Sequence, residues 1–181
     1  EIQCGLGRTG YLWAHQAYNV TPDIMTLAKP LAAGLPMGAI LMTQAVADVM
    51  GVGDHGSTFA AGPLVCRVAQ VVLERVSNPD FLAAVREKGQ HLGARLAALV
   101  ETSPLARVAR GVGLMWGVEC EVDAVNVIEA GYRHGILVCG AGPRVVRLVP
   151  PLTITLAELD ELVDRLAAAF THVEKEVRSE K

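Results

Sequence analysis

Residues 23–30 read DIMTLAKP, a short apolar run that ends in a lysine followed by a proline. A second run of this kind, GAILMT, occupies residues 38–43 after a loop rich in glycine and proline. Nearly continuous apolar runs bounded by Gly and Pro are typical of strands buried on both faces, as in an α/β sheet. The two runs therefore predict an α/β fold with strands at 23–28 and 38–43.

Two helices are expected next. Pro63 suits a first helical turn and precedes apolar residues at helical spacing, which predicts a helix over 64–76. Asn78 lies in a stop and cap signal, after which residues 81–100 predict a long amphipathic helix. We expect these elements to complete a first domain over residues 1–103.

The rest of the chain follows a different pattern, from which we expect a small α+β domain over residues 104–181. Its predicted elements, in order, are a strand at 108–121, a helix at 124–134 capped by Gly135, a strand pair at 136–139 and 145–149, and a final helix at 156–177.

Gly5, Gly7 and Gly10 have the spacing of a dinucleotide-binding turn. Such a turn needs an acid about 20 residues further on to hold the ribose. The next acid, Asp23, comes too early and belongs to the next predicted strand. NAD binding is thus the weaker alternative, and we interpret the glycines as a conformational turn. Residues 1–4 resemble the end of a buried strand, so we expect the chain to be the carboxy-terminal piece of a longer one.

Composition excludes several classes of function. The 181 residues carry a net charge of −3 with no cluster of Lys and Arg, which gives nucleic-acid binding no support. The four cysteines are far apart, so neither zinc nor a disulfide framework is indicated. No apolar run is long enough to span a bilayer. We expect a cytoplasmic protein without a membrane or nucleic-acid partner.

Lys29 is the residue most suggestive of chemistry. It ends an apolar run and is followed by further apolar residues, which predicts that its amine is shielded from solvent. Burial disfavours the charged form of an amine, lowers its pKa and makes it nucleophilic. Lys29 is therefore a candidate for imine chemistry.

Ordered motifs now show a resemblance. The chain is similar to the carboxy-terminal half of class III (omega) aminotransferases, which depend on pyridoxal phosphate, and most of all to those that use acetylornithine. The resemblance runs through nearly all residues and is strongest at four motifs: EIQCGLGRTG at 1–10, PDIMTLAK at 22–29, GLPMGA at 34–39 and HGSTF at 55–59.

The resemblance implies fold type I, with the carboxy-terminal part of a large domain and a small α+β domain. It places Lys29 on the lysine that forms an imine with the cofactor, and Gln3 on the glutamine that binds the phenolic oxygen. Glu1 and Ile2 would be neighbours in the cofactor pocket. Thr58 would reach the phosphate of the partner subunit's cofactor, so that the resemblance implies a homodimer with shared active sites.

The resemblance also implies two substrate-binding residues. Ser57 would lie beside the substrate, and Arg147 would bind its carboxylate through the planar guanidinium. Other parts of the family site have no counterpart in this sequence: the aspartate that pairs with the cofactor ring, the phosphate loop, the stacking aromatic residue and a second arginine. On the residues alone, a structural, surface-facing position on a strand is the favoured interpretation of Arg147.

The implied reaction transfers the terminal amino group of N-acetylornithine to 2-oxoglutarate, a step of arginine biosynthesis. Ornithine, succinylornithine and 4-aminobutyrate are alternative donors, because related enzymes use the same lysine and similar carboxylate contacts. A catalytically silent remnant or dimerising module is the alternative outside enzymology.

Overall fold

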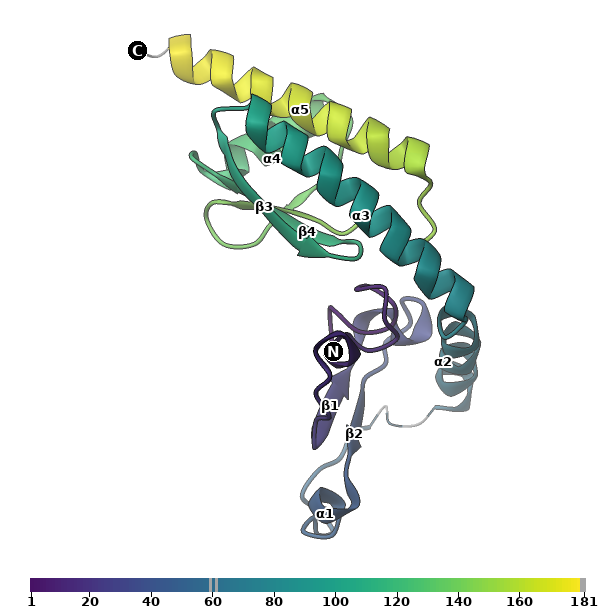
Figure 1. The fold of residues 1–181 in the computed structure, drawn as a ribbon. Helices are drawn as coiled ribbons and strands as arrows, with labels where there is room; N and C mark the ends of the chain where they lie inside the picture. Colours follow the sequence, from purple (N-terminus) through teal and green to yellow (C-terminus); the bar gives the residue numbers. More distant parts are fainter. Residues whose placement is uncertain (59, 61, 180–181) are drawn as a thin grey trace. The chain divides into compact units, whose positions relative to one another are not determined.

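The computed structural model describes residues 1–58, 60 and 62–179 (Figure 1). Contacts group the chain into two compact units, Glu1–Ala84 and Val85–Lys181. The boundary between these units falls inside the long helix α3 (Pro79–Thr102), whereas the sequence pattern predicts a division after residue 103. That domain division stays a prediction.

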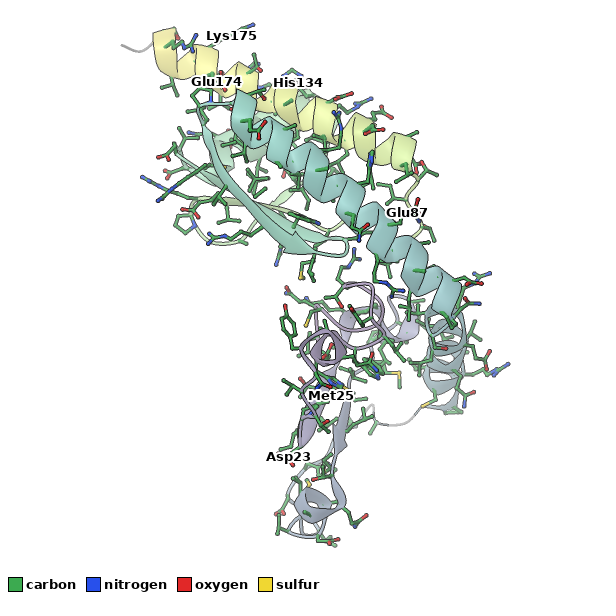
Figure 2. The ribbon with its side chains drawn as sticks, in the orientation of Figure 1. Asp23, Met25, Glu87, His134, Glu174 and Lys175 are labelled. Carbon is green, nitrogen blue, oxygen red and sulfur yellow. The ribbon has the colours of Figure 1, made fainter. Side chains whose placement is uncertain are left out.

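The first unit is built around a small antiparallel sheet. Strands β1 (Ile24–Leu27) and β2 (Ala39–Met42) pair so that Leu27 lies opposite Ala39. Both predicted strands are confirmed, and Asp23 and Met25, labelled in Figure 2, mark the start of β1. The expected burial on both faces is wrong, since Ile40 is 62% exposed. Among the described residues this sheet has only two strands, and Ile24 and Leu41 are exposed as well.

Helices make up the other described elements of the first unit. The remaining elements of the first unit are the 3-10 helices η1 (Ala14–Tyr18) and η2 (Lys29–Ala32), and the α-helices α1 (Gln44–Ala47) and α2 (Pro63–Val76). Their core is one apolar cluster: Leu6, Leu27, Leu31, Ala32 and Ala69. This cluster packs the glycine turn, the end of β1, η2 and α2 together, and so fixes the backbone on both sides of Lys29.

The second unit contains a four-stranded antiparallel sheet in the order β3-β4-β6-β5. The strands are β3 (Ala106–Val112), β4 (Met115–Cys120), β5 (Cys139–Gly140) and β6 (Val145–Leu148), and the helices are α3 (Pro79–Thr102), α4 (Ala124–Arg133) and α5 (Leu156–Ser179). The helix predictions are confirmed, including the cap, since the Asn78 side chain accepts hydrogen bonds from the backbone N–H groups of Asp80 and Phe81. The single predicted strand at 108–121 is wrong, because Gly113, with φ +54°, turns the chain between β3 and β4.

Alternate residues of this sheet face two environments. Val118, Val146 and Leu148 are at most 1% exposed and belong to the face packed under the helices. Cys120 shares this face, and burial raises the pKa of its thiol to about 11. The residues between them, including Gly117 and Arg147, lie on the opposite face. The sheet thus separates its apolar core from the face that bears Arg147.

Helix α3 approaches the β3–β4 turn very closely. Gly89 is buried, and a Cβ atom there would lie 2.5 Å from the carbonyl oxygen of Gly113. One turn along α3, a Cβ atom at Gly93 would lie 2.6 Å from the Trp116 ring. Trp116 in turn donates from Nε1 to the Gly113 carbonyl oxygen at 2.8 Å. Two glycines of α3 therefore form the surface on which the turn and the indole pack.

The start of α5 is closed by a capping box. The Thr155 N–H and hydroxyl groups each donate to Glu158 Oε2 at 2.8 Å, and the Glu158 N–H donates to Thr155 Oγ1 at 3.2 Å. The backbone N–H of Thr155, and then its hydroxyl, lower the pKa of Glu158 below its ordinary value of 4.5. A carboxyl with a lower pKa in the folded state stabilises that state above its unfolded pKa, and this contribution disappears as the pH falls through the folded value.

Replacing this carboxyl should remove one source of acid sensitivity. We expect Glu158→Gln to keep the capping hydrogen bonds and to show a smaller loss of melting temperature than the parent as the pH falls below the ordinary value of 4.5. Melting curves across the acid range measure this difference. Glu129→Gln, at an exposed position of α4, is the control and should follow the parent. Identical acid profiles for Glu158→Gln and the parent would contradict the assignment.

Within the part of the chain that the structure describes, no helix has both the length and the apolar character needed to cross a membrane.

Candidate active site

Lys29 lies in an unusual backbone conformation. It is the first residue of η2, separated from β1 by Ala28, and its φ angle is +38°. A side-chain-bearing residue in this left-handed region costs of the order of 1–3 kcal/mol, and such residues cluster at functional sites. Leu27 on one side and Leu31 on the other are both buried in the apolar cluster. Core packing therefore holds Lys29 in a conformation that a free chain would avoid.

The predicted shielding of Lys29 is wrong for the described residues, because its side chain is exposed. Residues of the neighbouring strands β1 and β2 are exposed in the same way. The apolar neighbours Leu27 and Leu31 anchor the backbone, but the described residues of the first unit leave Lys29 exposed. An exposed primary amine at a strained, anchored position is open to an incoming carbonyl compound.

The N-terminal turn is organised by the Glu1 carboxylate. Its two oxygens accept hydrogen bonds from the backbone N–H groups of Ala14 at 2.8 Å and His15 at 2.9 Å, which begin η1. Acceptors of this kind satisfy the unpaired N–H groups of a helix start. The structure therefore gives Glu1 a role in holding the turn, while its predicted neighbours Ile2 and Gln3 are exposed.

The glycine turn itself is confirmed as a conformational feature. Gly7 and Gly10 have φ angles of +84° and +83°, which favour glycine. The Gly10 N–H donates to the Gly7 carbonyl oxygen at 2.9 Å. Arg8, between them, is half-buried, and burial lowers the pKa of its guanidinium. The turn thereby places Leu6 in the same apolar cluster as the residues flanking Lys29.

Ser57 borders a cavity of about 310 Å³ in the first unit. Its lining residues are Pro36, Met37, Gly38, Ser57, Ala60, Gly62, Val65 and Cys66. Thr58 is exposed beside it, and Phe59 and Ala61 lie outside the described residues. The structure therefore brings the GLPMGA and HGST motifs together around one hollow, whose lining does not include Lys29 or Gln3.

Arg147 lies in β6 of the second unit and is half-buried. Its Nε donates to Cys139 Sγ at 3.4 Å. The loop that follows β6 is fixed from α3, since Lys88 Nζ donates to the carbonyl oxygen of Leu152 at 3.1 Å. Sequence reasoning missed Cys139 and Lys88, because both contacts depend on how separate elements pair.

Comparison with known proteins identifies the family. The family model of class III aminotransferases matches residues 1–170. Acetylornithine aminotransferase, mitochondrial, from Alnus glutinosa is 52% identical over 167 residues, which cover 92% of this chain and 37% of that protein. Acetylornithine aminotransferase from Bacillus subtilis is 40% identical over 172 residues, covering 95% of this chain and 44% of that protein.

Comparison with solved structures leads to the same family. Ornithine aminotransferase from Toxoplasma gondii superposes with a TM-score of 0.89 at 35% identity, covering 97% of this chain and 43% of that one. Acetylornithine aminotransferase from Elizabethkingia anophelis gives a TM-score of 0.87 at 31% identity, with 95% and 44% covered. This chain thus spans less than half the length of these relatives, and the predicted α/β fold type is confirmed. The chain belongs to the class III aminotransferases.

Proposed function

We propose that the protein containing this chain is a pyridoxal-phosphate-dependent aminotransferase that moves the terminal amino group of N-acetylornithine to 2-oxoglutarate, in arginine biosynthesis. The names of its relatives support the donor. The observation that carries the proposal is the conformation of Lys29, an exposed amine held at φ +38° between two buried leucines. Strain of this kind, at the motif shared with the family, favours a reacting residue.

The residues of this chain fit pyridoxal phosphate by the chemistry of their donors. Lys29 offers a primary amine for the cofactor aldehyde, and Gln3 offers an amide N–H for its phenolic oxygen. The hydroxyl of Thr58 suits a phosphate oxygen. Ile2 lies next to Gln3, and Glu1 holds the turn that presents both. When bound, the cofactor supplies an aldehyde and an electron-withdrawing ring that acidifies the carbon bearing the amino group.

Each proposed residue has one task. The Nζ atom of Lys29 would move a proton between the amino-bearing carbon of the substrate and the aldehyde carbon that the cofactor supplies, so that the amine ends each half-reaction in the state in which it began. Ser57 contacts the substrate beside the cofactor. Arg147 orients the substrate by pairing with its carboxylate. We propose that the remaining length of the protein and a second subunit exclude water from the site. In this homodimer, Thr58 of one subunit completes the active site of the other.

Ornithine is the second candidate donor, because solved ornithine aminotransferases superpose closely on this chain. The two substrates differ at the α-amino group, which is acetylated in one and cationic in the other. Initial rates of the purified natural protein with each donor and 2-oxoglutarate decide between them. A kcat/KM for N-acetylornithine above that for ornithine supports the proposal, and the reverse order contradicts it.

Removing the Arg147 guanidinium should weaken the hold on substrate carboxylates. We expect Arg147→Ala to raise the KM for 2-oxoglutarate about 100-fold, because a desolvated charge-assisted pair is lost. Steady-state kinetics of the natural protein measure this change. Arg144→Ala, at an exposed neighbouring position, is the matched control and should keep the parent KM. An unchanged KM in Arg147→Ala would remove Arg147 from the substrate site.

A further inference from the structure

Arg147 lies in the middle of a row of three residues across the sheet. In the strand register it is directly opposite Gly117 of β4 on one side and Cys139 of β5 on the other. Residues directly opposite in antiparallel strands place their side chains on the same face. The long Arg147 side chain therefore has a residue without a side chain on one flank and a small thiol on the other.

The thiol of Cys139 contacts Arg147 twice. Cys139 Sγ accepts a hydrogen bond from Arg147 Nε at 3.4 Å and donates to the Arg147 carbonyl oxygen at 3.8 Å. One sulfur atom thus links the side chain and the main chain of the same residue. A guanidinium tied to its own backbone in this way has less freedom to rotate about its stem.

We infer that Cys139 is a positioning residue for Arg147, and that its thiol aims the guanidinium at the substrate carboxylate. The inference rests on the proposed function, in which Arg147 binds that carboxylate. A guanidinium can pair with a carboxylate through the edge that includes Nε or through the edge formed by Nη1 and Nη2. Donation from Nε to sulfur engages the first of these edges, and the inference assigns the edge formed by Nη1 and Nη2 to the substrate.

Removing the thiol should affect binding more than turnover. Fixing a long side chain in advance saves about 0.5–1.5 kcal/mol on binding, which corresponds to about a two- to tenfold change in KM. We expect Cys139→Ala to raise the KM for 2-oxoglutarate by this factor while kcat changes less than about twofold. Cys139→Ser keeps a donor and an acceptor and should recover part of the loss. Leu137→Ala, at a position 88% exposed, is the control and should leave KM unchanged.

A spectroscopic measurement tests the geometry apart from activity. In the natural protein, the Nε–H group of Arg147 should exchange slowly with solvent in ¹⁵N NMR spectra, because it donates to sulfur. Cys139→Ala should make that exchange faster. If exchange is equally fast before and after the substitution, the thiol does not hold the guanidinium and the inference is overturned. If the alanine variant does not fold, the same exchange measurement on Cys139→Ser tests the inference.

Arg147→Ala separates the inference from the function on which it rests. If Arg147→Ala raises the KM and Cys139→Ala does not, Arg147 keeps its role and the positioning role of Cys139 is wrong. If neither substitution changes the KM, both are wrong. If both raise it, the double variant should match Arg147→Ala alone, because a positioning residue has no effect once its target is absent.

Discussion

Lys29→Ala should abolish aminotransferase activity in the natural protein, with a loss of at least about 10³-fold in kcat, because the amine that attaches the cofactor and moves the proton is gone. It should also abolish covalent attachment. After borohydride reduction, peptide mapping by mass spectrometry should find pyridoxal phosphate fixed to Lys29 in the parent and to no residue in the variant.

Lys175→Ala is the matched control for this experiment, since Lys175 is an exposed residue of α5 (Figure 2). It should keep both activity and attachment. Reduced cofactor on Lys88 or Lys175 of the parent, or activity above a tenth of the parent level in Lys29→Ala, would show that Lys29 is not the reacting amine. The silent remnant predicts no attachment in any variant.

Gly89→Ala should strongly destabilise the second unit. Alanine normally stabilises a helix relative to glycine by about 1 kcal/mol. Here the added Cβ would lie 2.5 Å from the Gly113 carbonyl oxygen and 2.7 Å from its Cα, so the helix and the turn must separate. Overpacking against backbone costs about 3 kcal/mol, which reverses the usual sign.

Urea unfolding of the natural protein and the variant measures this loss as a lower midpoint. Gln90→Ala, at the next and exposed position of α3, is the control and should change stability little. A Gly89→Ala variant as stable as the parent would mean that α3 and the β3–β4 turn do not pack as closely as described.

Local sequence patterns predict the helices of this chain well and its turns less well. Helix α3 follows from an amphipathic period and from the cap at Asn78, both of which are local. The turn between β3 and β4 was missed because Leu114, within the turn, is fully buried. Its apolar side chain continues the strand-like pattern through the point where the chain reverses.

Local sequence patterns likewise predict only part of the candidate site. Lys29 is recognisable because its anchors, Leu27 and Leu31, are neighbours in sequence. Its exposure could not be predicted, because burial depends on layers outside its own strand. The contact of Cys139 with Arg147 depends on the register between β5 and β6, which the loop between them sets. Residue types and spacing alone do not determine that register.

The hydrogen bonds of the Glu1 carboxylate join residues that are close in sequence, and this bears on the order in which the chain folds. The carboxylate bonds to residues only 13 and 14 positions away, and Cys139 bonds to a residue 8 positions away. Loops of about this length close in roughly 10–100 ns, far faster than distant strands pair. The N-terminal turn that contains Gln3 and the pair of strands β5 and β6 that contains Arg147 are therefore each assembled from nearby sequence. Either can form early, before the slowest contacts of the fold.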